Sequence, residues 1–263
     1  MIFLKSPQEI EIMRSANLIV AEVLAELRRH VHPGVTTAEL DRVAEEMTRR
    51  RGATPAFKGY EVGGRVFPAS VCISVNEEVV HGIPSERREL RPGDIVGIDF
   101  GVRYQGFYGD AAVTVPVAET DAESERLMRA TREALWAGID QVQVGKRLGE
   151  VSAAIQERVE RDGFSVVRDF VGHGIGKRLH EEPQVPNFGR PGRGLALEAG
   201  MVICIEPMVN EGRPEVRTLA DRWTVVTADQ GRSAHFEHTV AVQADGPQVL
   251  TVLPGVDPLV AAG

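Results

Sequence analysis

Residues 97–114 read Gly-Ile-Asp-Phe-Gly-Val-Arg-Tyr-Gln-Gly-Phe-Tyr-Gly-Asp-Ala-Ala-Val-Thr, and this stretch predicts two β-strands joined by a turn. Apolar, partly β-branched runs lie on both sides of a polar, glycine-containing centre. Asp99 lies inside the first run and Asp110 opens the second. A lone buried charge is costly, so each carboxylate needs a partner. Folding of the hairpin would bring the two carboxylates together around a cation; alternatively, each caps a strand end or pairs with an arginine.

The composition narrows the class of protein. The chain has 263 residues, of which 43% are hydrophobic and 26% are charged, as expected for an ordinary soluble α/β domain with a sizeable core. Its net charge of −8 argues against broad affinity for nucleic acid or for an anionic membrane, because both require clustered Lys and Arg.

The two cysteines, Cys72 and Cys204, each lie in an apolar run, and the sequence contains no Cys-x-x-Cys. This excludes a disulfide scaffold and a cysteine-based zinc ribbon, so buried reduced thiols are expected. The first residues lack the basic-then-apolar order of a signal peptide, and no apolar stretch approaches the length of about 18 residues that a membrane span needs. A cytoplasmic protein is therefore expected.

Local signals predict four helices. Capping boxes mark helix starts at residues 6–9, 36–39 and 120–123, and a fourth helix is predicted over about 148–161. Apolar runs predict strands at 71–75, 166–171, 201–206, 223–227 and 236–242. The segment 54–70 is rich in Gly and Pro and carries several aromatic residues, so we expect an irregular loop that lines a site.

The two halves of the chain resemble each other. Three pairs of segments match in the same order: Gly34–Gly52 with Gly145–Gly163, His81-Gly82-Ile83 with His173-Gly174-Ile175, and 93–99 with 200–206. Chance matching of short glycine-containing strings is the alternative to two structurally related halves. A pseudo-two-fold relation would place Asp99 and Glu206 at equivalent strand positions, and His81 and His173 at equivalent turns.

Five polar residues stand in apolar strands or glycine-rich turns: Asp99, Asp110, His173, Glu206 and Glu237. Four carboxylates and one imidazole cannot lie close together unpaired. Two divalent cations would neutralise them, and oxygen-rich ligation with one nitrogen suits Mn, Fe(II), Co or Zn.

A set of motifs then resembles the methionine aminopeptidases over nearly the whole chain, from Ser6 to about Val252. The motifs are Ile98-Asp99-Phe100-Gly101, Gly109-Asp110, Gly172-His173-Gly174-Ile175-Gly176, His180-Glu181-Glu182-Pro183, Ile205-Glu206-Pro207 and Phe236-Glu237-His238-Thr239. Val80-His81-Gly82-Ile83-Pro84 separates this group from its prolidase and Xaa-Pro aminopeptidase relatives. The chain begins directly at the first helix, which is similar to type I enzymes without the zinc-finger extension.

The resemblance implies the α+β pita-bread fold, in which pseudo-two-fold duplicated halves form a curved, mainly antiparallel sheet covered by helices on its outer face. We expect one catalytic domain over residues 1–263, with halves at about 1–118 and 119–263.

The resemblance also implies a role for each polar residue. Asp99 would chelate one metal ion, Asp110 and Glu237 would bridge both, and His173 with Glu206 would complete the other. His81 would contact the nitrogen of the scissile amide, and His180 its carbonyl oxygen. Considered singly, His81 is a turn residue and His180 a solvated residue beside two glutamates. His235 and His238 are interpreted as structural.

A methionine side chain would bind in an S1 pocket formed by Tyr60, Phe67, Cys72, His81 and Trp223, with Phe57 nearby. Three features depart from the family pattern: Leu179 replaces a common aromatic residue, Val80 replaces a frequent cysteine, and the segment 61–66 is longer than usual.

The implied activity is removal of the N-terminal methionine from nascent proteins and peptides whose second residue is small. A hydroxide bridging two divalent ions (Co, Mn, Fe(II) or Zn) would attack the carbonyl, and Glu206 would accept and relay the proton. The substrate partner is a peptide or nascent-protein N-terminus, a monomer is expected, and ribosome association stays open. The alternatives are a prolidase or Xaa-Pro aminopeptidase on the same fold, or a binding protein that has lost activity.

Overall fold

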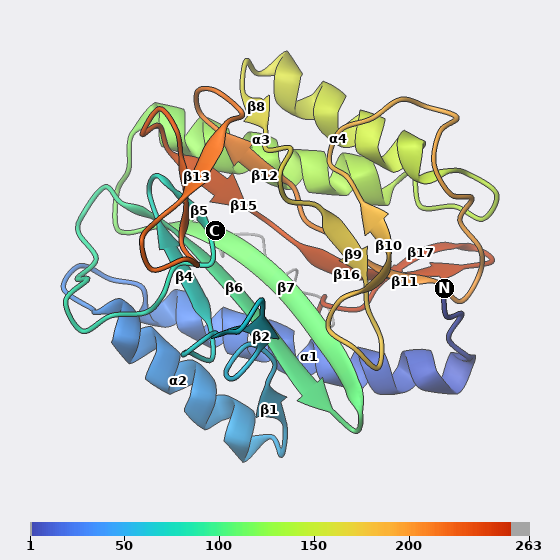
Figure 1. Cartoon of the computed structure of the whole chain (residues 1–263), viewed down its shortest axis with the longest axis horizontal. Coiled ribbons are helices and arrows are strands. Elements are labelled where there is room, and N and C mark those ends of the chain that lie inside the picture. Colours follow the sequence, from blue (N-terminus) through green and yellow to red (C-terminus); the bar gives the residue numbers. More distant parts are fainter. Residues whose placement is uncertain (1, 254–263) are drawn as a thin grey trace.

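The computed structural model describes residues 2–253. Its four helices are α1 (Pro7–His30), α2 (Thr37–Arg50), α3 (Ala122–Ile139) and α4 (Leu148–Arg161). In Figure 1 the pair α1 and α2 lies along one side of the molecule and the pair α3 and α4 along the opposite side, with the strands between them. No helix within residues 2–253 is both long and apolar enough to cross a membrane.

Residues 2–253 contain seventeen strands, and all of the pairings between them are antiparallel. The first-half strands are β1 (Thr54–Pro55), β2 (Glu61–Val62), β3 (Arg65–Val66), β4 (Cys72–Val75), β5 (Glu78–Val80), β6 (Ile95–Tyr104) and β7 (Phe107–Pro116). The second-half strands are β8 (Ser165–Val166), β9 (Gly172–Gly174), β10 (Glu181–Val185), β11 (Val202–Ile205), β12 (Met208–Asn210), β13 (Val216–Thr218), β14 (Val225–Thr227), β15 (Ser233–His235), β16 (His238–Gln243) and β17 (Gly246–Val249).

Two sheets carry most of the structure. In one, β6 pairs with β1, β4 and β7; the other has the order β10-β9-β11-β16-β17. Smaller sheets have the orders β15-β12-β8, β13-β14-β5 and β2-β3. A continuous core between the sheets and the helices contains fully buried side chains from both halves, including Leu24, Leu27, Ile98, Phe100, Leu127 and Leu135.

The predicted hairpin is β6 and β7, each ten residues long. Asp99 lies opposite Ala112, and Asp110 lies opposite Gly101. Because side chains alternate between the two faces of a strand, this register places Asp99 and Asp110 on the same face, two residue positions apart.

The helix starts follow the predicted capping, with one correction. Ser6 and Glu9 form a reciprocal capping box at α1, and Thr36 and Glu39 form one at α2. The third box is wrong, because the N-cap of α3 is Asp121, whose side chain accepts a hydrogen bond from the Ser124 N–H. The preceding threonine instead donates to the Gly93 carbonyl.

The same loop geometry recurs in both halves. Gly34 and Gly145 have φ values of 91° and 88°, and they donate to the carbonyls of Leu90 and Leu197. Gly93 and Gly200 likewise have φ values of 90° and 92° and donate to the carbonyls of Val117 and Val242. Glycine is favoured at such φ values because it has no Cβ. These correspondences make β6 and β11 equivalent strands.

The predicted equivalence of His81 and His173 is wrong. His173 lies in β9, which pairs with β11 as β4 pairs with β6, whereas His81 follows β5. The shared His-Gly-Ile triplet therefore does not reflect the duplication.

Two further predictions, one of a strand and one of a loop, also need correction. The extended segment at 166–171 ends after Val166, and pairing resumes only at Gly172. The segment 54–70 is not wholly irregular, because it contains β1 and the small β2–β3 hairpin. Cys72 and Cys204 are buried free thiols, as expected.

Candidate metal centre

Three of the five proposed ligands converge tightly. Asp110 on β7, His173 on β9 and Glu237 between β15 and β16 each place one ligand atom within 4.8 Å of the others, and the Cys204 thiol on β11 completes this group. The four side chains come from four separate segments, so only the folded chain forms the cluster.

Strand register explains the convergence. The Glu237 N–H donates to the Ala112 carbonyl at 2.9 Å, while Asp99 lies opposite Ala112 on its other side. Asp99, Ala112 and Glu237 therefore lie side by side on three neighbouring segments, with Ala112 between the two carboxylates. On β11, Ile205 lies opposite His238, and continuing this register brings Glu206 beside Glu237.

His173 lies between the carboxylates. Its Nε2 is 3.5 Å from Glu206 Oε1 and 3.9 Å from Asp110 Oδ2, while its Nδ1 is 2.9 Å from the Gly174 carbonyl. Because a carbonyl only accepts, Nδ1 carries the hydrogen in this neutral ring and Nε2 keeps its lone pair. Burial lowers the pKa of His173 to about 3, so the ring is neutral at physiological pH.

The backbone of Asp110 is held from two sides. Its N–H donates to Asn17 Oδ1 of α1, and its carbonyl accepts from Thr239 Oγ1 at 2.8 Å. Gly109 allows this approach, because a Cβ there would lie 2.9 Å from the Asn17 backbone nitrogen. Helix α1 therefore packs directly against the strand that carries Asp110.

The carboxylates of the cluster disfavour one another's charged forms. Burial raises the pKa of Asp99 to about 7, and burial together with neighbouring carboxylates raises the pKa of Asp110, Glu206 and Glu237 well above the ordinary range. Asp110 Oδ1 and Glu237 Oε1 are buried, and neither has a hydrogen-bond partner among the described residues. Several carboxylate oxygens and one imidazole nitrogen form a donor set that suits divalent Mn, Fe, Co or Zn, so the residues fit such ions.

Two residues with no predicted role in the site, Cys204 and His235, adjoin this cluster. Cys204 precedes Glu206 by two residues on a strand, and His235 precedes Glu237 by two residues. Side chains two residues apart on a strand share a face, so this spacing could have indicated that Cys204 and His235 lie near the carboxylates. His235 Nε2 lies 3.7 Å from Glu206 Oε2.

His81 and His180 lie in the same cleft as the carboxylates. The His180 ring centroid is 4.4 Å from that of His173, and its Nδ1 is 2.6 Å from the Tyr60 hydroxyl. His81 adopts a left-handed φ of 61° and packs edge-on against the rings of Phe170 and Trp223. Burial, with a contribution from His180, lowers the pKa of His81 to about 4.

The cleft has a volume of about 730 Å³. Every residue assigned above to metal, amide or methionine contact lines it: Tyr60, Phe67, Cys72, His81, Asp99, Asp110, His173, His180, Glu206, Trp223 and Glu237. Phe57 and Leu179 also line it. The structure thus places carboxylates and an aromatic wall in one cavity.

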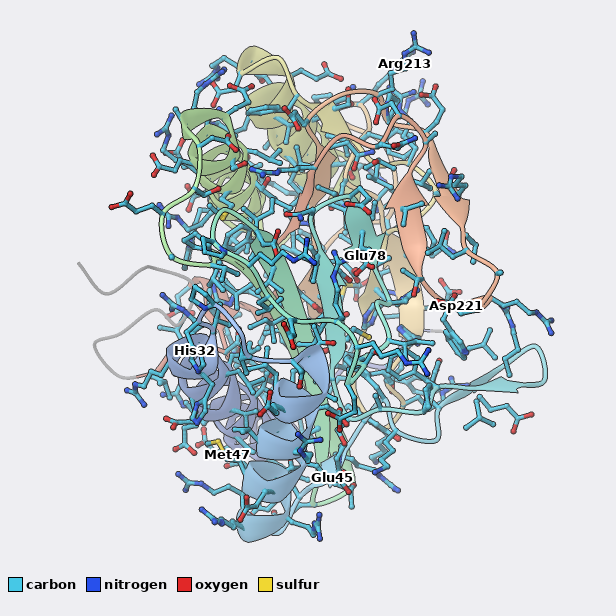
Figure 2. The ribbon with its side chains drawn as sticks, turned by 90° about the vertical axis from the view of Figure 1, so that its left-hand side faces the viewer. His32, Glu45, Met47, Glu78, Arg213 and Asp221 are labelled. Carbon is cyan, nitrogen blue, oxygen red and sulfur yellow. The ribbon has the colours of Figure 1, made fainter. Side chains whose placement is uncertain are left out.

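The aromatic wall is fixed by its own contacts. Phe67 meets Trp223 edge-on at 5.3 Å between ring centroids, and the Arg65 guanidinium lies 5.5 Å from the Trp223 ring. Asp221, labelled in Figure 2, accepts hydrogen bonds from the N–H groups of Trp223 and Thr224. This turn orients the indole toward the cleft.

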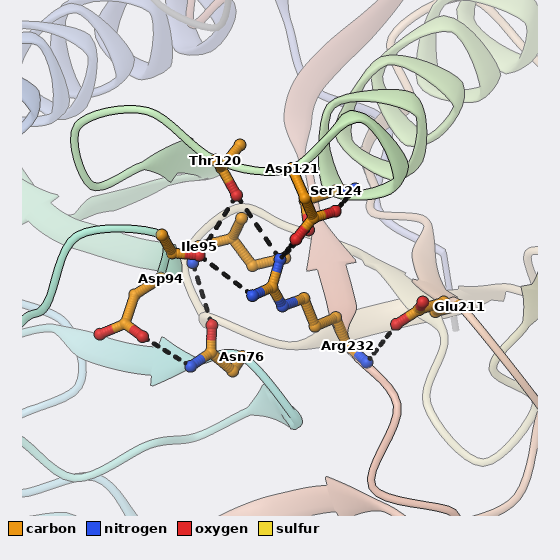
Figure 3. A network of polar contacts seen from close by, with 9 residues as sticks. Asn76, Asp94, Ile95, Thr120, Asp121, Ser124, Glu211 and Arg232 are labelled. Carbon is orange, nitrogen blue, oxygen red and sulfur yellow. Dashed lines mark hydrogen bonds and ion pairs between the residues drawn. The ribbon is translucent and has the colours of Figure 1, made fainter.

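A second polar network, shown in Figure 3, supports the strand that leads to the cluster. The Arg232 guanidinium contacts the Gly93 carbonyl, Asp121 and Ser124, and its backbone N–H donates to Glu211. Arg232 therefore ties the start of β15 to the N-terminus of α3 and to the turn before β6.

Comparison with known proteins gives a consistent result. Residues 11–244 match metallopeptidase family M24. The chain is 55% identical to a methionine aminopeptidase of Clostridium perfringens, in an alignment that covers 96% of this chain and all of that one. It is 49% identical to methionine aminopeptidase 1 of Bacillus subtilis, in an alignment that covers 95% of this chain and 99% of that one. The crystal structure of a Thermotoga maritima methionine aminopeptidase covers 95% of this chain and 99% of its own, with a TM-score of 0.93 and 48% identity.

The fold extends to more distant structures. A prolidase from Pyrococcus horikoshii superimposes with a TM-score of 0.76 at 22% identity, over 95% of this chain and 64% of its own. These comparisons confirm both the resemblance inferred from the motifs and the pita-bread fold.

Proposed function

This chain belongs to metallopeptidase family M24, and from that premise we propose that it removes the N-terminal methionine from peptides and nascent proteins whose second residue is small. One observation carries the proposal: a buried group of carboxylates and one imidazole lies in the same cleft as a row of aromatic side chains. A lone carboxylate cluster fits many metal sites, whereas the adjoining apolar wall suits an unbranched thioether.

We assign the ligands of two divalent ions to Asp99, Asp110, His173, Glu206 and Glu237. When bound, such ions make hydroxide available near neutral pH and polarise the scissile carbonyl. The nature of the ions is proposed as Co, Mn, Fe(II) or Zn, from the oxygen-rich donor set.

The remaining roles belong to the side chains themselves. Glu206 takes up the proton of the attacking nucleophile and passes it to the departing amine. His81 and His180 contact the nitrogen and the carbonyl oxygen of the scissile amide. The hydrogen bond between Tyr60 and His180 orients the latter ring. Both imidazoles are neutral at physiological pH, since burial lowers their pKa values.

We assign the methionine side chain to the pocket of Tyr60, Phe67, Cys72, His81 and Trp223. Burial of the thioether among the aromatic rings of this pocket excludes water and positions the scissile amide of the substrate next to the carboxylates. We further propose a monomer that acts in the cytoplasm as one catalytic domain, with ribosome contact as a separate question for binding experiments.

The experiment is release of free methionine from a Met-Ala-x peptide, measured for the metal-loaded enzyme, after chelation, and with Asp110→Ala. We expect turnover in the metal-loaded wild type and in metal-loaded Asp245→Asn, which changes an exposed turn carboxylate, and no turnover after chelation or in Asp110→Ala. Undiminished turnover in chelated enzyme would refute the proposal. A parallel x-Pro panel tests the prolidase and Xaa-Pro aminopeptidase alternative.

A further inference from the structure

The buried imidazole of His235 has a nitrogen with no hydrogen-bond partner within residues 2–253. His235, on β15, is 4% exposed, and its Nε2 has no partner in the described structure. A buried polar atom left without a hydrogen-bond partner destabilises the fold. A hydrogen-bond acceptor near His235 Nε2 would therefore stabilise this ring.

A carboxylate of the candidate metal centre lies close to this nitrogen. His235 Nε2 is 3.7 Å from Glu206 Oε2, while Glu206 Oε1 is 3.5 Å from His173 Nε2. The two oxygens of Glu206 thus face two different imidazoles. One oxygen points toward the proposed ligand cluster, and the other points toward His235.

Both groups are held by their backbones. The His235 N–H donates to Thr114 Oγ1 at 2.9 Å, and the same hydroxyl donates to the His235 carbonyl at 2.9 Å. The Asn187 side chain donates to the Glu206 carbonyl at 3.0 Å. The terminal torsion of a glutamate is broad, so a small rotation of the carboxylate closes 3.7 Å to hydrogen-bond length without moving either backbone.

We propose that His235 is a positioning residue for Glu206: its Nε2–H donates to Glu206 Oε2 and fixes the carboxylate with Oε1 toward the ligand cluster. This inference rests on the proposed function, in which Glu206 both binds an ion and accepts a proton. A carboxylate with these two tasks needs a fixed orientation, because its oxygens are otherwise interchangeable by rotation. The neighbours of metal ligands commonly supply such orientation.

The chain offers a matched control on the other side of Glu237. His238 is also fully buried, but its Nδ1 lies 2.6 Å from Thr251 Oγ1 and its ring packs edge-on against Trp136. His238→Gln therefore disturbs a buried imidazole of the same segment whose Nδ1 faces Thr251.

The experiment compares His235→Leu, His235→Asn, His235→Gln and His238→Gln in the full chain. The readouts are kcat and KM for Met-Ala-x, the Co(II) dissociation constant by calorimetry, and the visible absorption bands of the Co(II)-loaded protein. We expect His235→Leu to lower kcat by about 10- to 100-fold with little change in KM, and to shift the Co(II) bands. His235→Gln, whose amide is long enough to reach Glu206, should restore both kcat and the Co(II) bands. His235→Asn, whose side chain is shorter, should restore neither.

For His238→Gln we expect unchanged Co(II) bands and unchanged kcat per folded molecule. Unaltered kcat and bands in His235→Leu would overturn the inference, as would equal loss in the Leu and Gln variants with unaltered bands. If His235→Leu does not fold, the contrast between Asn and Gln carries the test. Absence of methionine release by wild type defeats the proposed function instead, while the Co(II) spectra still report the His235–Glu206 contact.

Discussion

Replacing Asp99 by asparagine will stabilise the metal-free protein near neutral pH while it abolishes activity. Asp99 lies between Cys72 of β4 and Ala112 of β7, and burial raises its pKa from the ordinary 3.8 to about 7. Between these values the folded state holds a proton that the unfolded state has released. Stability from this group is therefore complete below about pH 4 and is lost as the pH rises toward 7.

The size of this effect follows from the shift. Each pH unit between the two pKa values costs about 1.4 kcal/mol, which amounts to about 3 kcal/mol between pH 5 and pH 7. The buried histidines act in the opposite direction over this range, because burial lowers their pKa values and their charging destabilises the fold at low pH. Their contribution cancels when Asp99→Asn is compared with wild type at each pH.

The assay is urea unfolding of chelator-treated wild type and Asp99→Asn at several pH values from 5 to 8. We expect the difference in unfolding free energy to change by about 3 kcal/mol in favour of the variant as the pH rises to 7. Saturating divalent metal should reverse the order, because only wild type keeps the full ligand set. Asp245→Asn controls for removal of an exposed carboxylate. A difference that stays constant from pH 5 to 8 would refute the reasoning.

Three further outcomes are expected. Lys5 and Glu181 form an ion pair of 2.8 Å, and their side chains are only 6% and 4% exposed. Lys5→Met or Glu181→Gln alone should lower the free energy of unfolding by about 3–5 kcal/mol, because the remaining partner stays buried. Replacing both residues by apolar ones should recover most of this loss, as measured by chemical unfolding. Cys72 and Cys204 should resist a thiol reagent in the native protein, because burial raises their pKa values, and both should react on unfolding; rapid native labelling would contradict this. Trp223→Ala should raise KM for methionyl peptides more than it lowers kcat, since the indole lines the cleft but touches no proposed ligand; an unchanged KM would argue against the assigned pocket.

The sequence alone determined the local elements and the chemical character of the site. Capping boxes located α1 and α2 because a helix N-terminus needs local hydrogen-bond acceptors, and these lie within three residues along the chain. Carboxylates inside apolar strands identified Asp99 and Asp110 as residues with a special role, since burial of an unpaired charge is costly. The motif set identified the family, and comparison with relatives confirms it.

Only the tertiary structure decided which groups meet. The 3.5 Å approach of His173 to Glu206 depends on the order of β9, β11 and β16 in one sheet, which connects residues far apart in sequence. The same packing shows that His81 and His173 are not equivalent and that His235 faces Glu206. A linear pattern records which face of a strand a residue occupies, but pairing between distant strands is a property of the whole folded chain, and it is this pairing that sets the distances within the site.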